Sequence, residues 1–121
     1  MKELSVTFSR EQIAEYAEAS GDRNPIHLDE EFARSVGLPG VIAHGMLQMG
    51  LLARVAGDQA RLRRLSCRFA AIVRPGDTVT FRAAERGEGG DQLELSAVNQ
   101  DGQAVLTRAS AELGPPSAAE H

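Results

Sequence analysis

The stretch HGMLQMGLLARVAG, residues 44 to 57, decides how the rest of this chain can fold. Its apolar residues are interrupted only by Gln48 and Arg54, so a helix formed here is apolar nearly all round. A helix of that kind is buried on most of its sides rather than lying on a surface. Other elements must therefore surround it, and we expect it at the centre of the domain.

The chain on either side of this helix supplies strands, because apolar and polar residues alternate there. We expect a first strand at 4–8 and later strands at 65–73, 79–83, 93–97 and 105–113. Turns are predicted at Pro75-Gly76-Asp77, in a flexible loop over 87–91 and at Asp101-Gly102, a typical two-residue hairpin turn. The simplest packing is a single α+β domain in which an antiparallel sheet curls around the central helix.

Two shorter helices are expected before the central one. Ser9 opens a capping-box pattern, and the next ten residues keep helical apolar spacing. Asp29 can cap a short helix over 30–36, with Phe32 and Val36 directed inward. We prefer this capping role for Asp29 over a catalytic one.

The side chains that could carry chemistry gather in SGDRNPIHLDEEFARSVGLPGVIAHGMLQMG, residues 20 to 50. Two turn signals, Gly21-Asp22 and Asn24-Pro25, place Asp22 and His27 on irregular backbone that the proline stiffens. General acid–base catalysis needs two titratable groups held toward one small volume, and this loop suits it. From the residues alone, however, Asp22 as a turn residue is the simpler interpretation.

The start of the central helix is the second candidate feature. Gly45 exposes backbone N–H groups that can meet a developing negative charge. His44 beside it is expected to pack or cap there, with a substrate contact open. A metal site from Asp22, His27, Asp29 or His44 is possible by residue type, but no distinctive ligand spacing supports it.

The runs SGDRNPIHLD and GVIAHGMLQMG resemble the hydratase motif of the MaoC-like dehydratases, also called (R)-specific enoyl hydratases. The resemblance extends more weakly over residues 4–113. It implies a hot-dog fold over 1–113, and the composition of 114–121 predicts a disordered tail. It also implies action on acyl thioesters of coenzyme A or acyl carrier protein, interconverting trans-2-enoyl and (R)-3-hydroxyacyl forms without a metal or cofactor.

On this resemblance Asp22 and His27 are the catalytic pair that grips one water, one removing its proton while the other delivers a proton to Cα. Which residue does which stays open. The N–H of Gly45 would bond the thioester carbonyl, and we expect His44 and Asn24 at the substrate site, Asn24 by holding the loop. Ala53 departs from the pattern, because some family members have a serine there that supports the catalytic acid.

The resemblance also bears on partners. Family members join the sheets of two subunits edge to edge, so we expect a homodimer. A heterodimer with a second hot-dog chain stays open, because subunits of heterodimeric carrier-protein dehydratases share an HGM-L-x-MG run. A hot-dog thioesterase and a non-catalytic acyl-binding protein are the remaining alternatives, although a thioesterase gives no reason for the GDRNPIH loop.

Composition narrows the classes of partner. With 121 residues and a net charge of −4, the chain fits one soluble domain and not a nucleic-acid binder. Its single cysteine and the lack of a signal-like or membrane-spanning run favour a cytoplasmic protein without membrane contact. One basic stripe stands out, and we expect some of its members to meet coenzyme A phosphates or a carrier protein: Arg61, Arg63, Arg64, Arg68 and Arg74.

Overall fold

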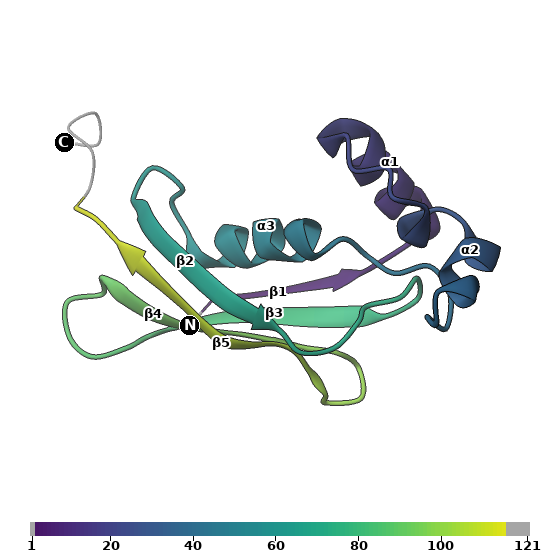
Figure 1. The fold of residues 1–121 in the computed structure, drawn as a ribbon. Coiled ribbons are helices and arrows are strands. Elements are labelled where there is room, and N and C mark those ends of the chain that lie inside the picture. The colour runs from purple at the N-terminus through teal and green to yellow at the C-terminus, as the bar shows by residue number, and fades with distance from the viewer. Residues whose placement is uncertain (1, 116–121) are drawn as a thin grey trace.

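The computed structural model describes residues 2–115, so most of the predicted tail lies outside the described residues. Along the chain the elements are β1 (Lys2–Thr7), α1 (Arg10–Ser20), the 3-10 turn η1 (Pro25–His27), α2 (Glu30–Ser35), α3 (Gly45–Ala56), β2 (Leu62–Phe69), β3 (Thr78–Glu85), β4 (Gln92–Val98) and β5 (Ala104–Leu113). Figure 1 shows α3 lying over one face of the curved sheet, with α1 and α2 at one end of it. The predicted α+β domain with a central helix is therefore confirmed.

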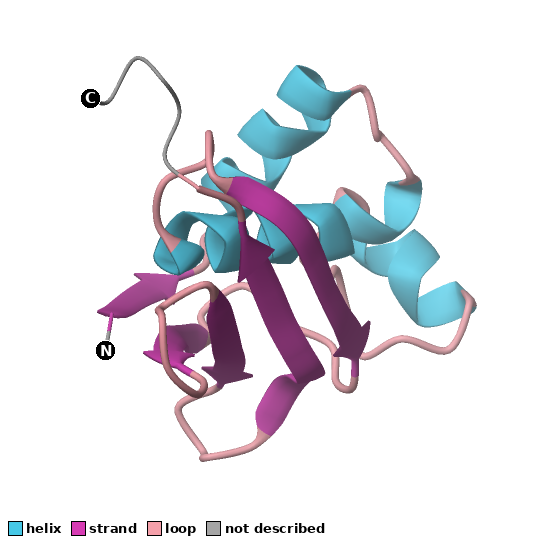
Figure 2. Cartoon of the chain, turned by 90° about the vertical axis from the view of Figure 1, so that its left-hand side faces the viewer, coloured by secondary structure: helices cyan, strands magenta, loops and turns pink. Residues whose placement is uncertain are grey.

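The sheet has five strands within the described residues, in the order β1-β3-β4-β5-β2. All of its neighbouring pairs are antiparallel. Figure 2 shows the long strands curving across the helix they cover. The two edges of the sheet are β1 and β2, and β2 is the strand that follows α3. Its outer backbone groups are free to pair with another strand.

The core lies between α3 and the concave face of the sheet. Leu52, Val55 and Ala56 point from the helix toward buried residues of the strands, among them Phe81 and Val105. Fully burying a side chain the size of Leu52 or Val55 stabilises the fold by about 1.5–3 kcal/mol. This cluster fixes the helix on the sheet and thereby fixes the position of its N-terminus.

The prediction that α3 is buried on most of its sides is confirmed, and one stripe of the helix is left uncovered. Met46, Gly50 and Arg54 recur every fourth residue and are exposed, Met46 by 63%. The apolar pattern of the helix therefore exceeds what one sheet covers. None of the helices in the described part of the chain is long and apolar enough to cross a membrane.

Both predicted helix caps are present. The Ser9 hydroxyl accepts a hydrogen bond from the N–H of residue 12 at the start of α1, and Asp29 accepts one from Phe32 N–H at 3.1 Å. The inward direction predicted for Phe32 and Val36 is wrong, since they are 40% and 54% exposed. The helix α2 ends at residue 35 and buries its small residue Ala33 instead.

Three strand predictions are corrected in detail. The strand β2 ends at Phe69 rather than at residue 73, because the next two N–H groups both turn to the carbonyl of Val105. A register shift between residues 62 and 64 leaves Arg63 and Arg64 both exposed, so their alternation is broken. The β4–β5 turn is a three-residue loop, with Gly102 in the left-handed region at φ 79°.

Candidate active site

The loop after α1 holds Asp22 through short-range hydrogen bonds. Gly21 ends the helix in the left-handed region at φ 81°, and Ser20 Oγ accepts from Asp22 N–H at 3.1 Å. Asp22 Oδ1 in turn accepts from the N–H of Asn24 at 3.3 Å. Asn24 Oδ1 accepts from the N–H of Ile26 at 3.1 Å and caps η1. The side chain of Asn24 thus shapes the loop, as predicted.

His27 is the buried member of the predicted pair, with 8% of its surface exposed. Its Nδ1 lies 2.7 Å from the carbonyl oxygen of Ile42, which can only accept a hydrogen bond. Nδ1 therefore carries the hydrogen, and in the neutral ring Nε2 is left with a lone pair. That lone pair belongs to the edge of the ring that faces Asp22.

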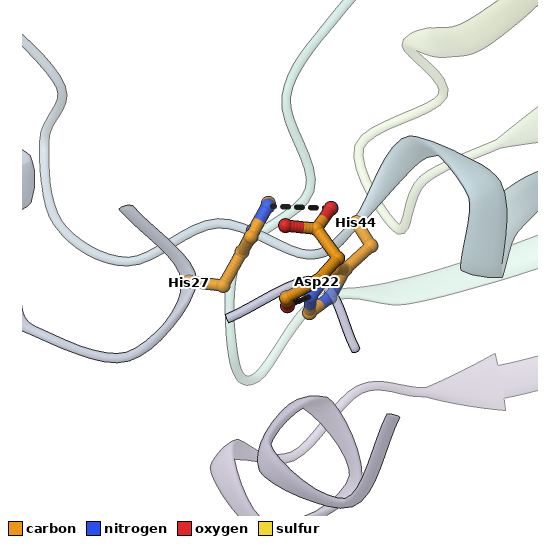
Figure 3. Close-up of side chains that lie close together, drawn as sticks. All are labelled: Asp22, His27 and His44. Atoms are coloured by element: carbon orange, nitrogen blue, oxygen red, sulfur yellow. Dashed lines mark hydrogen bonds and ion pairs between the residues drawn. The ribbon is translucent and has the colours of Figure 1, made fainter. Parts of the chain in front are cut away.

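Asp22 and His27 meet as the sequence predicts. Asp22 Oδ2 lies 3.9 Å from His27 Nε2, and the Asp22 side chain is 55% exposed (Figure 3). This separation is too long for a direct hydrogen bond. If a water oxygen lay about 2.8 Å from both atoms, the angle from Asp22 Oδ2 through the water to His27 Nε2 would be about 90°. That angle allows the water to donate one hydrogen bond to each atom. The pair is therefore arranged to hold one water between an accepting nitrogen and a carboxylate.

His44 lies behind this pair and is 1% exposed. Its Nε2 donates to the main-chain carbonyl of Asp22 at 2.9 Å. Its ring stacks on His27 with centroids 3.7 Å apart and an interplanar angle of 20°, and Tyr16 meets it edge-on at 4.8 Å. His44 is the residue before α3, yet its side chain makes no capping hydrogen bond. The ring packs inside the site, and burial removes it from direct contact with solvent.

Gly45 begins α3 beside these rings. None of the described residues accepts a hydrogen bond from its backbone N–H, as expected for the first turn of a helix. A Cβ at this position would lie 3.0 Å from both Cε1 and Cζ of Phe69, so a larger residue here would have to displace that exposed ring slightly. The free N–H and the positive end of the helix dipole together favour a developing negative charge here.

The cluster Asp22, His27 and His44 also has the composition of a metal site, with possible ligand atoms within 4.8 Å of one another. An imidazole binds a metal ion in the plane of its ring. The two ring planes are inclined by only 20°, so they intersect about 10 Å from the rings. A zinc ion bound in both planes would have to lie at that intersection, whereas a histidine nitrogen binds zinc at about 2.0–2.1 Å. This stacked geometry is unsuited to an ion shared by both rings.

Several residues around the site escape prediction from sequence. The carbonyl of Ile42 and the ring of Phe69 become visible only once the chain is folded, because no local pattern distinguishes them. Gln48 did leave a signal as the single uncharged polar side chain of the apolar helix. It is 3% exposed, its Nε2 lies 3.4 Å from the carbonyl of His44, and its Oε1 has no partner among the described residues.

Ala53 is half-buried on α3 and offers no hydrogen bond to Asp22 from its methyl group. The carboxylate of Asp22 instead receives the main-chain N–H of Asn24 described above. Alanine at position 53 therefore removes one possible hydrogen-bond donor to Asp22, but the carboxylate still has the donor N–H of Asn24.

The predicted arginine stripe separates into two groups. Three of its members are engaged with main-chain carbonyls, Arg61 with Gly114, Arg63 with Ala60 and Arg74 with Pro39. Arg64 and Arg68 are exposed on the edge strand β2, and no ion pair or hydrogen bond of their side chains occurs within residues 2–115. Within the described residues, Arg64 and Arg68 are thus the two members of the stripe whose guanidinium groups have no partner, whereas each of the other three keeps some free N–H donors.

Glu30 at the start of α2 ties this helix to its surroundings. Partial burial raises the pKa of Glu30. This effect is outweighed by hydrogen bonds from Arg10 and from Val41 N–H and by the positive charges of Arg10 and Arg34, so the pKa is below its ordinary value. Arg10 Nη2 lies 2.5 Å from the carboxylate and Val41 N lies 3.2 Å from it. A Cβ at Gly40 would lie 2.5 Å from Glu30 Oε2, so the backbone of the loop that leads to α3 packs closely against this carboxylate.

Comparison with known proteins agrees with this geometry. Residues 1–105 match the MaoC like domain family. The chain is 31% identical to the peroxisomal hydratase-dehydrogenase-epimerase of Neurospora crassa, covering 91% of this chain and 12% of that protein. It is 35% identical to the fatty acid synthase beta subunit pigK of Monascus ruber, covering 86% and 6% respectively. The chain therefore spans only a small part of these curated relatives.

Solved structures share the whole fold. The (R)-hydratase from A. caviae involved in PHA biosynthesis superposes with a TM-score of 0.79 at 30% identity, covering 94% of this chain and 92% of that one. The antiparallel sheet around a central helix is thus the predicted hot-dog fold. Since the family match includes both the Asp22–His27 loop and the start of α3, the chain belongs to the MaoC-like domain family.

Proposed function

We propose that this domain is an (R)-specific hydratase that interconverts trans-2-enoyl and (R)-3-hydroxyacyl thioesters of coenzyme A or acyl carrier protein. The observation that carries the proposal is the 3.9 Å separation between His27 Nε2 and Asp22 Oδ2, with Nδ1 of His27 already donating to a carbonyl. This arrangement supports a single water held by one proton acceptor and one carboxylate.

In the hydration direction, His27 Nε2 takes a proton from the water while Asp22 accepts the hydrogen bond of its other O–H. The water oxygen bonds to C3, and the electrons of the double bond move toward Cα and the thioester carbonyl. The N–H of Gly45 stabilises the resulting enolate-like oxygen. The His27 imidazolium, stabilised by the Asp22 carboxylate, then returns its proton to Cα on the same face, so in this proposal His27 performs both transfers that the resemblance divides between the pair. One water is added, and both side chains return to their starting states.

An assay with crotonyl coenzyme A tests this function against the alternatives. Hydration removes the absorbance of the conjugated enoyl group without releasing a free thiol. A thioesterase releases the thiol, and a non-catalytic acyl-binding protein changes neither signal. Chiral analysis of the product tests the (R) assignment. Thiol release, or the (S) product, would refute the proposal.

We further propose that Arg64 and Arg68 bind the phosphates of coenzyme A or the acidic face of a carrier protein. Their exposure and lack of partners within the described residues support this, and Arg61 and Arg63 have weaker claims because their side chains are engaged. Arginine binds phosphate oxygens through paired N–H donors, which suits this class of ligand.

The subunit arrangement that we propose is a homodimer joined along the edge strand β2. The free edge of β2 and the exposed apolar side chains Met46, Phe69 and Ile72 support an interface on this side of the domain. Light scattering at micromolar concentration should give the mass of a dimer. A monomer with full activity would contradict this, and activity only with a second hot-dog chain would favour the heterodimer.

We place the protein in the cytoplasm because its one cysteine, Cys67, cannot form an internal disulfide. Burial raises the pKa of this thiol, which favours the uncharged and less reactive form. A fluorescent fusion examined in cells tests the location, and accumulation in an oxidising compartment or an organelle would refute it.

A further inference from the structure

The catalytic loop and the segment that leads into α3 are joined by a reciprocal set of hydrogen bonds. Nδ1 of His27 donates to the carbonyl of Ile42, two residues before His44. Nε2 of His44 donates to the carbonyl of Asp22, five residues before His27. Between them, the N–H of Ile42 donates to the carbonyl of Ile26 at 3.1 Å. Each histidine is thus tied to the backbone segment that carries the other, and we call this arrangement the histidine clasp.

The His44 side chain has one polar partner in this clasp. Its Nε2–H bonds Asp22, while its buried Nδ1 has no hydrogen-bond partner among residues 2–115. The stack with His27 and the edge contact with Tyr16 would be available to any flat aromatic ring. The bond to the Asp22 carbonyl is therefore the interaction that specifically requires an imidazole donor at position 44.

The location of that bond gives it a consequence for chemistry. The acceptor is the main chain of Asp22, and the donor is the residue next to Gly45. The bond fixes the carboxylate–imidazole pair relative to the N–H that is aimed at the thioester carbonyl. Asp22 itself is 55% exposed and lies on a loop, so few packing contacts hold it in place otherwise.

We propose that His44 is a positioning residue, not a substrate ligand, and that its Nε2–H holds Asp22 at the distance from Gly45 that the water addition requires. This inference rests on the proposed hydratase function. A misplacement of reacting groups by about 1 Å costs about 10²-fold in rate, so the loss of one tether at this place is sufficient to be measured.

Three variants separate the donor from the ring. His44→Gln places an amide N–H near the position of Nε2 and keeps the tether while removing the stack. His44→Phe keeps the stack and removes the donor. His44→Asn is polar and small enough to fit, but its amide N–H lies near the position of Nδ1 and cannot reach the same carbonyl. Arg23→Gln is the control, since Arg23 lies on the same loop and pairs outward with Glu18 at 2.8 Å.

With crotonyl coenzyme A, we expect His44→Gln to keep kcat within about threefold, and His44→Phe and His44→Asn to lower kcat by about 10²-fold with little change in KM. Arg23→Gln should behave as the wild type. Circular dichroism confirms that each variant is folded. The positioning role is overturned if His44→Asn retains kcat, if His44→Gln falls as far as the other two variants, or if KM alone changes.

Nitrogen-15 spectra of the imidazole rings provide a readout that does not depend on activity. The wild type should show a proton on Nδ1 of His27 and on Nε2 of His44. The His27 Nδ1–H signal should stay sharp in His44→Gln, where it shifts only through loss of the stacked ring, and should broaden in His44→Asn. If the wild type hydrates neither crotonyl coenzyme A nor the crotonyl thioester of an acyl carrier protein but shows this pattern, the hydratase proposal fails and the tether stands. The opposite tautomer on His44 would refute the tether whatever the activity.

Discussion

The sharpest prediction concerns the pair that holds the water, and it uses replacements that each remove one of the two groups facing that water. Asp22→Asn keeps the size of the side chain and its Oδ1-like acceptor but removes the charge. His27→Asn places an amide N–H near Nδ1, so the hydrogen bond to the Ile42 carbonyl can persist while Nε2 is removed. Each variant therefore takes away one of the two groups that face the water across 3.9 Å.

The expected magnitude follows from how the two groups share that water. One positioned acid or base contributes about 10²–10⁴-fold, equivalent to about 2.7–5.5 kcal/mol of transition-state stabilisation. If the two groups acted independently, the double variant would lose about 10⁴–10⁸-fold. Because a single water needs both groups at once, we expect the double variant to be no slower than the poorer single variant within about threefold.

Stability distinguishes these variants from less conservative ones. Asp22→Asn should hardly change the melting temperature, because the side chain is half exposed. His27→Ala, by contrast, leaves the partly buried carbonyl of Ile42 without its imidazole donor, a loss of about 1–3 kcal/mol at most. For a domain of this size that lowers the melting temperature by about 4 °C per kcal/mol. His27→Asn avoids most of this loss and is the cleaner probe of catalysis.

The assay is the initial rate of crotonyl coenzyme A hydration, with melting curves for each variant. The reasoning is refuted if either single variant hydrates at a near-wild-type rate, which would move the chemistry to another residue. It is also refuted if the two losses multiply in the double variant. A loss of activity that follows unfolding would return Asp22 to the role of a turn residue.

Three further outcomes are expected. Gly45→Ala should lower kcat/KM by about tenfold or more, because the new methyl group lies 3.0 Å from Phe69 and crowds the backbone N–H. The melting temperature should fall by no more than about 4 °C, because the Phe69 ring is exposed and can shift. The pKa of Glu30 is lowered in the folded protein, so its stabilising effect is complete above the ordinary pKa of 4.5 and is lost as the pH falls through the lower folded pKa. The difference in melting temperature between the wild type and Glu30→Gln should therefore persist from pH 8 to about 5 and shrink at lower pH. A difference that stays constant with pH would contradict this. The KM for crotonyl coenzyme A should rise with salt while kcat changes little, and Arg64→Gln with Arg68→Gln should remove that rise; a salt-independent KM in the wild type would exclude the phosphate contact.

The sequence by itself determined the elements and the candidate pair. The alternation of strands and the apolar helix at 44–57 encode the sheet-around-helix fold, because side-chain periodicity is a local property of the chain. Ser9 and Asp29 cap their helices as predicted, since a cap joins residues only three positions apart. Asp22 and His27 were identified by their spacing on a proline-stiffened loop and by the family motif, and the fold brings them together.

The tertiary structure alone decided how those residues are connected. The acceptors of the two imidazole rings lie 15 and 22 residues away along the chain, so no local pattern specifies them. The exposure of Phe32 and Val36 likewise depends on what α2 packs against, and its apolar spacing cannot reveal that. A sequence shows which side chains can ionise. Which ring nitrogen keeps its lone pair depends on the carbonyl that folding places beside the other nitrogen.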